Sequence, residues 1–491
     1  MGFKEDMREN NSRRFKKNKN SRSRQALKEL NLPVQKNDII ETRVTGQGNS
    51  GEAVLRVEDF PLFMPGGLPG EQVRARVVRV NPSHGFARLE EILEPSPERV
   101  EPPCPYYGRC GGCSLQHQSY EGQLRFKAER VKDCFVRIGG FLNPEVLPAI
   151  GMETPWRYRN KVQMPVGEQD GEIRVGFYRE RSHEIIDIKE CLIQNQASDV
   201  VAETVRIWLN TWAIPVAQGD REIIPGSVRH LLIREGRTTG QIMVVLVATS
   251  TDIPHLEELT QSLKEAVPGF TGLILNINDQ VTNRVLGAEN HTVWGKDHII
   301  DTIGDVRYRI SPHSFFQVNP EQTKVMYDKV LELAQFKGAE RVLDLYCGAG
   351  SIALYIAKEA GQVTGVEIVP EAIEDANFNK AMNGIENVRF ILGKAEDEIG
   401  RLMKENEEVD MVIVDPPRKG CDESLLKAIG ESKIPRMIYV SCDPATLARD
   451  AAILKTYGFE PDVIQPVDNF PQSHHVETVV LMCASSKAGK C

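Results

Sequence analysis

The sequence of 491 residues contains no apolar run near the length of about 20 residues that a membrane-spanning helix needs. Its N-terminus, MGFKEDMREN, lacks the apolar centre of a secretory signal peptide, and Asp6 stands where a myristoylation signal requires Ser or Thr. Repeats of the solenoid kind are also missing. These absences predict a cytoplasmic protein without a membrane partner, and no obligate protein partner is evident. A chain of this length is expected to form about three domains.

The net charge of −9 conceals a basic N-terminus. Residues 1–36 hold eleven Lys or Arg and four Asp or Glu side chains, a net charge of +7, which leaves −16 for the remainder. This segment is rich in Asn and Ser and has almost no large apolar side chains, so it is expected to be a disordered tail. It either holds a polyanion through counterion release or only aids solubility.

Residues 37–94 predict a small closed β-barrel of the OB type. Glycine-containing turns separate segments with the composition of strands, at 39–44, 52–57, 60–64 and 72–80. In the last segment Arg74, Arg76 and Arg79 are interleaved with valines. Such barrels commonly bind nucleic acid, and the arginines suit that role. The alternative is a barrel that only packs against its neighbour.

The C-terminal part, from about residue 315, has the repeating pattern of an α/β sheet. It predicts an open, mostly parallel, doubly wound sheet with strands at 341–345, 363–367, 388–392, 410–414, 436–440, 460–465 and 476–483. Residues 155–300 mix strands and helices without a nucleotide fingerprint, and a helix is expected over 120–138. The predicted fold is therefore multidomain: a barrel, an α+β middle domain with a cysteine cluster, and a Rossmann-like α/β domain.

A glycine-rich loop over residues 344–351 follows the first strand of this sheet. Gly348 and Gly350 let the backbone approach a ligand closely. The loop is not G-x-G-x-x-G and lacks the lysine of a P-loop. Glu367 ends the second strand about twenty residues later, where a carboxylate can accept both ribose hydroxyls. S-adenosylmethionine, which carries no phosphate, fits this pattern better than a dinucleotide.

Cys442 lies about one hundred residues beyond this loop, at the end of another expected strand, and the loop 415–418 (DPPR) lies between them. Loops of that type are often found where a planar base meets its modifying enzyme. Carbon-5 of uracil is a poor nucleophile, but a thiolate added to carbon-6 turns the ring into an enolate that can attack a sulfonium methyl group. A base must then remove the carbon-5 proton. Cys442 is expected to be the thiol, with a lowered pKa, and Glu477 the base, with His474 and His475 as alternatives.

The spacing of the cysteines matters more than their number of ten, because a disulfide framework is not expected in a cytosolic chain. Cys104, Cys110 and Cys113 form C-x5-C-x2-C, and Cys191 lies far downstream. Four thiolates suit an iron–sulfur cluster, and by themselves they suit zinc equally. Another segment, TPWRYRNK, mixes aromatic rings with three cations that suit RNA phosphates and splayed bases: Arg157, Arg159 and Lys161.

The segments LDLYCGAGSIAL, IVDPPRKG, YVSCDPATLARD and HHVETVVLM resemble those of the RNA uracil-5-methyltransferase family. The cysteine spacing resembles the iron–sulfur branch of that family, the 23S ribosomal RNA enzymes, and residues 37–94 resemble their TRAM domain. The resemblance runs from about residue 37 to residue 483. Some members carry Phe and Asn where this chain has Tyr346 and Ser351, which weakens the assignment to one rRNA position.

The resemblance implies an rRNA-processing enzyme that methylates carbon-5 of a flipped uridine in 23S rRNA. It implies that Cys442 is the nucleophile and Glu477 the base. The residues implied at S-adenosylmethionine are Gln317, Tyr346, Glu367 and Asp415, and those implied at a [4Fe–4S] cluster are Cys104, Cys110, Cys113 and Cys191. The alternatives are a non-catalytic iron–sulfur RNA-binding protein and a tRNA uracil-5-methyltransferase. The barrel and the cysteines count against the latter, since typical bacterial tRNA enzymes lack both.

The implied domains are not all continuous in sequence. After the tail (1–36) and the TRAM barrel (37–94), residues 95–115 and 148–314 form the iron–sulfur, RNA-binding middle domain. Residues 116–147 are expected to join 315–491 in the methyltransferase domain, although they precede the middle domain.

Overall fold

The computed structural model describes residues 32–217, 224–404, 408–432 and 434–484. The predicted basic tail therefore lies almost wholly outside the described residues. The chain divides into two compact units: residues up to 101 with 117–119, and residues 102–116 with those from 120 onward. Among the helices that are described, none is both long enough and apolar enough to cross a membrane.

The first unit is a closed barrel with the strand order β1-β2-β3-β5-β4, as predicted. Its strands are β1 (Ile39–Gln47), β2 (Ala53–Val57), β3 (Phe60–Met64), β4 (Gln72–Val80) and β5 (Gly85–Glu94). Leu55, Leu62 and Val73 are fully buried inside it, because alternate side chains of a strand point to the same face. The fifth strand was not among the predicted segments. Charged residues interrupt its apolar pattern, and it closes the barrel by pairing with β3 and β4.

The barrel arginines are not all available to a ligand. Arg74 forms ion pairs with Glu41 and Glu91, and Arg76 pairs with Glu90. Arg79 is exposed and forms no ion pair with another described residue. Two of the three arginines expected to suit nucleic acid are therefore neutralised on the barrel surface itself.

The second unit begins with a seven-stranded sheet in the order β12-β11-β10-β9-β6-β7-β8. Its strands are β6 (Lys161–Gln169), β7 (Glu172–Tyr178), β8 (Ile185–Asp187), β9 (Val228–Glu235), β10 (Ile242–Ala248), β11 (Phe270–Ile277) and β12 (Glu289–Gly295). Helices α3 (Gln196–Thr211) and α4 (Leu256–Ala266) cover one face, where they pack on Val244 and Leu246. Met243 and Val245 belong to the core of the C-terminal sheet. The central strand β10 is apolar throughout because both of its faces are buried.

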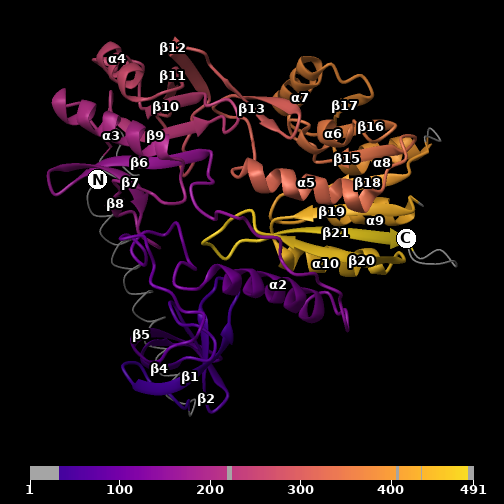
Figure 1. Ribbon diagram of the computed structural model, residues 1–491, viewed down its shortest axis with the longest axis horizontal. Coiled ribbons are helices and arrows are strands. Elements are labelled where there is room, and N and C mark those ends of the chain that lie inside the picture. Colours follow the sequence, from indigo (N-terminus) through magenta and orange to yellow (C-terminus); the bar gives the residue numbers. More distant parts are fainter. Residues whose placement is uncertain (1–31, 218–223, 405–407, 433, 485–491) are drawn as a thin grey trace, which may run out of the picture. The chain divides into compact units, whose positions relative to one another are not determined.

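A hairpin of β13 (Ile299–Ile303) and β14 (Val306–Ile310) leads to the second seven-stranded sheet, in the order β17-β16-β15-β18-β19-β21-β20. Figure 1 shows these strands side by side. They are β15 (Arg341–Leu345), β16 (Gln362–Glu367), β17 (Val388–Leu392), β18 (Met411–Val414), β19 (Arg436–Ser441), β20 (Phe459–Val467) and β21 (Glu477–Ala484). All but β21 run in the same direction, and β21 is antiparallel to both of its neighbours, β19 and β20. The predicted doubly wound sheet is confirmed.

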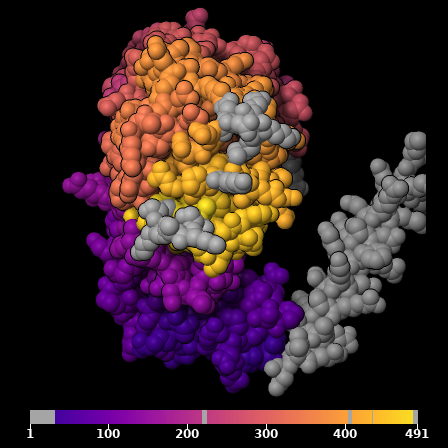
Figure 2. All heavy atoms as spheres, turned by 90° about the vertical axis from the view of Figure 1, so that its right-hand side faces the viewer, coloured from indigo at the N-terminus to yellow at the C-terminus, as the bar shows by residue number. Residues whose placement is uncertain are grey.

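Helices cover both faces of this sheet. One apolar core includes side chains of α5 (Pro320–Ala334) and α6 (Ser351–Ile356), and α7 (Pro370–Asn383) packs on β14, β16 and β17. The other core includes α8 (Ala395–Lys404), α9 (Glu423–Glu431), α10 (Pro444–Lys455) and α2 (Tyr120–Arg137). The space-filling view in Figure 2 shows the orange residues of the first β-α units directly against the yellow residues of the last strands.

Helix α2 precedes the middle sheet in sequence, yet it packs against α10 and β20 of the C-terminal sheet. Val131, Cys134 and Phe135 lie on one side of the helix and are buried there, since residues three and four apart share a helix face. The chain thus first contributes α2 to the C-terminal layer, then forms the middle sheet, and then forms the C-terminal sheet itself.

Candidate functional site

Four of the predicted site residues lie at one edge of the C-terminal sheet. Tyr346, Asp415 and Cys442 each follow a parallel strand directly, and Glu367 ends one. The carboxyl ends of parallel strands meet at the same edge, where ligands bind in open α/β sheets. Strand β21 starts at that edge because it runs in the opposite direction: Ser441 pairs with Thr478, which brings Glu477 to the end of β19 beside Cys442.

The glycine-rich loop at this edge is held by the carboxylate of Glu367. The backbone N–H of Gly348 donates to Glu367 Oε2 over 3.1 Å, and those of Ile368 and Val369 donate to Oε1. Gly350 has a φ of +78°, and a Cβ there would lie 2.6 Å from the ring of Phe390. Only glycine fits at this position, because the ring of Phe390 packs directly against the turn.

Two polar groups beside this loop have no partner among the described residues. The hydroxyl of Tyr346 and Oδ1 of Asp344 are buried without a hydrogen bond, while Asp344 Oδ2 accepts from Ala353 N over 2.9 Å. Burial, reinforced by Asp415, raises the pKa of Asp344 to about 8, and burial raises that of Asp415 to about 7. Unsatisfied buried polar groups are costly, so they indicate a polar ligand. Asp344 was not predicted as a separate site residue, and its only sequence signal is a carboxylate inside an apolar strand.

Gln317 lies in the segment before α5, and hydrogen bonds connect this segment to the loop between β20 and β21. Asn469 Nδ2 donates to Gln317 Oε1 over 3.4 Å, and Asn319 Nδ2 donates to the carbonyl of Asn469 over 3.2 Å. Gln317 itself is 9% exposed. Its position is therefore set by the same loop that leads into Glu477.

The thiol of Cys442 is in an environment that keeps it protonated. Burial raises its pKa to about 12, and the carboxylates of Glu477 and Asp415 add to that effect, while Arg418 opposes it. The predicted lowered pKa is therefore wrong. Burial and two nearby acids outweigh a single guanidinium group.

Glu477 is only 3% exposed. Burial raises its pKa to about 8, Asp415 raises it further and Arg418 lowers it. The carboxyl group therefore changes charge slightly above neutral pH, as suits a group that takes up a proton during turnover.

Arg418 is the cation that acts on both Cys442 and Glu477, and the sequence showed it only as part of the 415–418 loop. Helix α10, which starts two residues after Cys442, holds that loop in place. Thr446 Oγ1 donates to the carbonyl of Arg418 over 3.2 Å, and the buried carboxylate of Asp450 accepts from Cys421 N over 2.8 Å. The thiol and the guanidinium group are thus positioned by one helix.

The two histidines considered as alternative bases lie in the loop 468–476, which Figure 1 shows projecting from the sheet. Burial lowers the pKa of His474 to about 4 and that of His475 to about 3, and nearby cations lower both further. Ser114 Oγ accepts from the backbone N–H of His474 over 3.0 Å, and Arg130 donates to its carbonyl over 2.6 Å. Imidazoles with such pKa values are weak bases near neutral pH.

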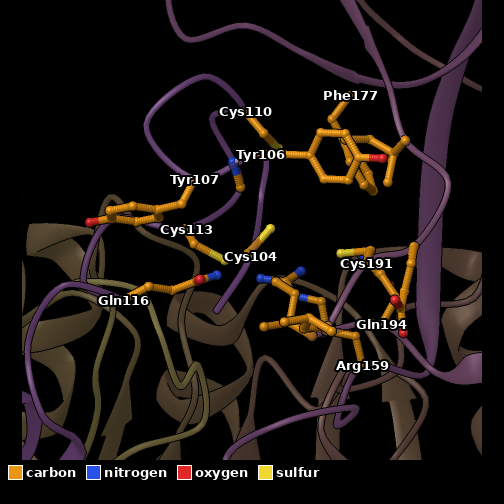
Figure 3. Close-up of a pocket in the computed structure, with 15 residues that line it drawn as sticks. Cys104, Tyr106, Tyr107, Cys110, Cys113, Gln116, Arg159, Phe177, Cys191 and Gln194 are labelled. Atoms are coloured by element: carbon orange, nitrogen blue, oxygen red, sulfur yellow. Dashed lines mark hydrogen bonds between the residues drawn. The ribbon is translucent and has the colours of Figure 1, made fainter. Parts of the chain in front are cut away.

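The four predicted ligand cysteines line one cavity of about 190 Å³, as Figure 3 shows. Burial raises the pKa of Cys113 to about 12, and the other three thiols, those of Cys191, Cys110 and Cys104, raise it further. The guanidinium group of Arg159 points into the space between Cys113 and Cys191. Within the described residues, no group of three or more His, Cys, Asp or Glu side chains is arranged to hold a metal ion. The thiols are gathered, but the structure contains no formed metal site there.

Arg157 holds the segment around Cys191 and is not free for RNA. Its guanidinium group donates to the carbonyl of Cys191 over 2.9 Å and to Asp199 Oδ2 over 2.6 Å, and it pairs with Glu190. Of the three cations in the TPWRYRNK segment, one is therefore tied to acids and one lies at the cysteine cavity. Lys161 alone has neither kind of partner.

Known proteins match this chain over nearly its whole length. Residues 288–485 match the tRNA (uracil-5-)-methyltransferase family, and residues 33–89 match the TRAM domain. RNA methyltransferases of Halalkalibacterium halodurans and Clostridium tetani are each 46% identical over 92% of this chain, and over 98% and 97% of their own lengths. The crystal structure of Pyrococcus abyssi tRNA (uracil-54, C5)-methyltransferase, in complex with S-adenosyl-L-homocysteine, matches with a TM-score of 0.74 and 29% identity. That match covers 90% of this chain and 99% of the Pyrococcus chain.

Proposed function

We propose that this chain, which belongs to the RNA uracil-5-methyltransferase family, methylates carbon-5 of a uridine in 23S rRNA with S-adenosylmethionine as the methyl donor. The observation that carries the proposal is the meeting of Cys442 and Glu477 at one sheet edge, next to a glycine-rich loop with unsatisfied buried polar groups. A thiol and a carboxylate are the two groups that this reaction requires. Membership of a methyltransferase family argues against the non-catalytic alternative.

Cys442 is the nucleophile of the proposed reaction. Its thiol gives up a proton, the sulfur bonds to carbon-6 of the flipped uracil, and the ring becomes an enolate. Carbon-5 then attacks the methyl group of S-adenosylmethionine, whose sulfur leaves with the bonding pair as S-adenosylhomocysteine. Because burial and the nearby acids keep the free thiol protonated, we infer that proton loss accompanies RNA binding. Arg418 is the cation placed to stabilise the negative charge that develops.

Glu477 is the base that completes the reaction. Its carboxylate takes the proton from carbon-5, the carbon-5–carbon-6 double bond re-forms, and the bond between carbon-6 and the Cys442 sulfur breaks. Over the whole cycle one proton is released, because a methyl group replaces a hydrogen atom. The raised pKa of Glu477 makes its carboxylate a stronger base than an exposed one.

The methyl donor is assigned to the loop 344–351 and to the residues around it: Gln317, Tyr346, Glu367 and Asp415. The unpartnered Tyr346 hydroxyl and Asp344 oxygen support this assignment, because a polar ligand would satisfy them. Glu367 sits at the end of the second strand, the position of a ribose-binding carboxylate. The complex of the Pyrococcus relative with S-adenosylhomocysteine supports the same choice of ligand.

We propose further that the cysteine cavity holds a [4Fe–4S] cluster on Cys104, Cys110, Cys113 and Cys191. Support comes from four thiols around one cavity and from hydrogen bonds that Cys110 and Cys191 accept from backbone N–H groups. Thiolate ligation requires all four protons to be displaced. The methyl transfer has no redox step, so the cluster would brace the middle domain.

We propose the following roles for the domains. Residues 95–115 and 148–314 bind RNA, and residues 116–147 with 315–491 carry out the methyl transfer.

A second candidate substrate is tRNA. The Pyrococcus relative is named as a tRNA (uracil-54, C5)-methyltransferase, and its match leaves only a tenth of this chain uncovered. The uncovered tenth is shorter than the barrel segment 37–94, so the match to an enzyme named for tRNA includes at least part of the barrel, and the barrel is weak evidence against tRNA.

The test is mass-spectrometric mapping of 5-methyluridine in rRNA and tRNA from a strain that lacks this gene. We expect at least one 5-methyluridine to be absent from its 23S rRNA and to be restored by the purified protein with S-adenosylmethionine. A loss confined to tRNA would establish the second candidate instead. Unchanged 5-methyluridine in both RNAs would refute the proposed function.

A further inference from the structure

Two cations lie directly opposite each other on neighbouring strands of the middle sheet. Strands β6 and β9 are antiparallel, and their register pairs Lys161 with Arg234. Side chains of such a pair project from the same face of the sheet, at a short separation. Like charges in that position destabilise a sheet unless an opposite charge lies between them.

A histidine, His313, lies at the same corner. Arg234 is 3% exposed, and its guanidinium group donates to the carbonyls of Pro312 and Ser314, over 3.2 and 2.6 Å. His313 lies between these two carbonyls in sequence, and its side chain is exposed. Both Arg234 and Lys161 lower the pKa of His313, after the larger effect of burial. The two cations therefore lie near enough to His313 to keep its imidazole neutral at neutral pH.

No carboxylate balances these cations in the part of the chain that the structure describes. Neither Lys161 nor Arg234 forms an ion pair with a described residue, and Nε of Arg234 is buried without a hydrogen bond. Burial and Arg234 lower the pKa of Lys161 to about 8. Most other middle-domain cations are neutralised, as Arg157 is by Asp199 and Glu190. A cross-strand pair of cations, one of them buried with an unsatisfied donor, is stabilised by an anion.

We propose that Lys161, Arg234 and His313 form a binding site for one phosphate group of the RNA backbone, next to the target uridine. The inference rests on the proposed function for the identity of the anion. The site adjoins the methyl-donor region, because Asn160 donates to the carbonyl of Gln317 through Nδ2 and to that of Val318 through its backbone N–H, over 3.0 and 2.9 Å. The side chain of Phe315, 77% exposed in the same segment, offers a ring for an unpaired base.

The phosphate site is tested by the salt dependence of RNA binding. The probe is a fluorescently labelled oligouridylate of about 12 nucleotides. Loss of one lysine–phosphate contact should weaken binding about threefold to tenfold and reduce the slope of log K against log salt by about 0.7. We expect this result for Lys161→Gln, and Lys161→Arg should restore most of the affinity because it keeps the charge.

Lys296→Gln is the matched control, since Lys296 is an exposed lysine of the same domain away from the pair. Lys161→Gln should leave the Tm unchanged or raise it, because it removes repulsion from Arg234, whereas loss of a structural residue would lower it. The proposal is overturned if Lys161→Gln binds the probe with the wild-type affinity and slope. It is equally overturned if this variant loses affinity for S-adenosylmethionine or for inorganic phosphate but not for the oligouridylate.

Failure of this inference and failure of the proposed function give different results. If the wild-type protein transfers methyl groups to RNA but Lys161→Gln binds the oligouridylate normally, only the phosphate site is refuted. If the wild-type protein transfers no methyl group to any RNA, the proposed function fails first.

Discussion

Cys442 and Glu477 lie beside each other, and the pKa of each is raised. The thiol has a pKa raised to about 12 and the carboxyl group one raised to about 8, and Arg418 lowers both. Each group therefore rests largely protonated at neutral pH. The arrangement suits a site that becomes reactive only when substrate brings in new charge and displaces water.

Replacing Cys442 tests the covalent step. Cys442→Ala should reduce methyl transfer at least about 10³-fold, because no other group can add to carbon-6. Affinity for S-adenosylmethionine, measured by calorimetry, should stay near the wild-type value. Cys134→Ala is the control, since that thiol lies in the core beneath α2. Full activity in Cys442→Ala would contradict a covalent mechanism.

Replacing Glu477 tests the base. Glu477→Gln cannot accept the carbon-5 proton, so the methylated RNA should remain bonded to Cys442. Labelled RNA should then migrate with the protein on a denaturing gel, and the double variant Cys442→Ala/Glu477→Gln should show no such band. Normal turnover by Glu477→Gln would assign the proton transfer to another group.

The raised pKa of Glu477 predicts an alkaline rise in activity. Below about pH 8 the carboxyl group is protonated and cannot take up a proton, so the single-turnover rate should increase with pH and level off above that value. The same group opposes folding at high pH, because ionising it in the core becomes costly as pH rises through its folded pKa. Glu477→Gln should therefore have a higher Tm than the wild type at about pH 9. A rate that falls between about pH 7 and pH 9 would contradict this assignment.

Helix α2 and the loop 468–476 form a supporting pair beneath the site. Lys127 and Asp468 are both fully buried and form an ion pair, and Tyr120 donates its hydroxyl hydrogen to Asp468 Oδ2 over 2.9 Å. Gln123 Nε2 also donates to Gln472 Oε1 over 3.0 Å. The loop that leads into Glu477 is therefore anchored by a helix more than 300 residues earlier in the chain.

Breaking this buried pair should be costly. Lys127→Met leaves Asp468 buried without its cation and should lower the free energy of unfolding by about 3–5 kcal/mol, measured by urea denaturation. Adding Asp468→Asn should recover part of that loss. Lys132→Met, on the exposed side of the same helix, should change stability by no more than about 0.5 kcal/mol. Equal effects of the two lysine variants would show that the pair does not contribute.

Across the whole molecule, the cysteine cavity joins two segments distant in sequence, residues 104–113 and the segment at Cys191. Protein purified without oxygen should contain about four iron atoms and four acid-labile sulfides per chain. Cys191→Ser should lose most of both and lower the Tm, because the two segments would no longer be linked. Stoichiometric zinc without sulfide would contradict the cluster and leave a structural zinc site.

The strands of the C-terminal sheet, its mostly parallel, doubly wound class and the edge that carries the site were predictable from the sequence. Each predicted strand of the C-terminal sheet lies within two residues of the observed one, because a buried parallel strand is a short apolar run between turn residues. The convergence of Tyr346, Asp415 and Cys442 follows from the same pattern, since each ends a parallel strand. The strand β5 was missed because the charges along it mask its alternation.

Charge state and pairing depended on neighbours that no local pattern reveals. The pKa of Cys442 is raised and not lowered because β21 brings in Glu477 and the 415–418 loop brings in Asp415. The sequence predicted Arg157 as an RNA contact, but in the folded chain it forms an ion pair with Asp199. Lys161 is a candidate phosphate ligand because Arg234 on β9 lies directly opposite it. Periodicity and motif spacing are local properties, so the sequence alone determines them. Burial and long-range electrostatics depend on contacts between distant segments, and these exist only once the chain has folded.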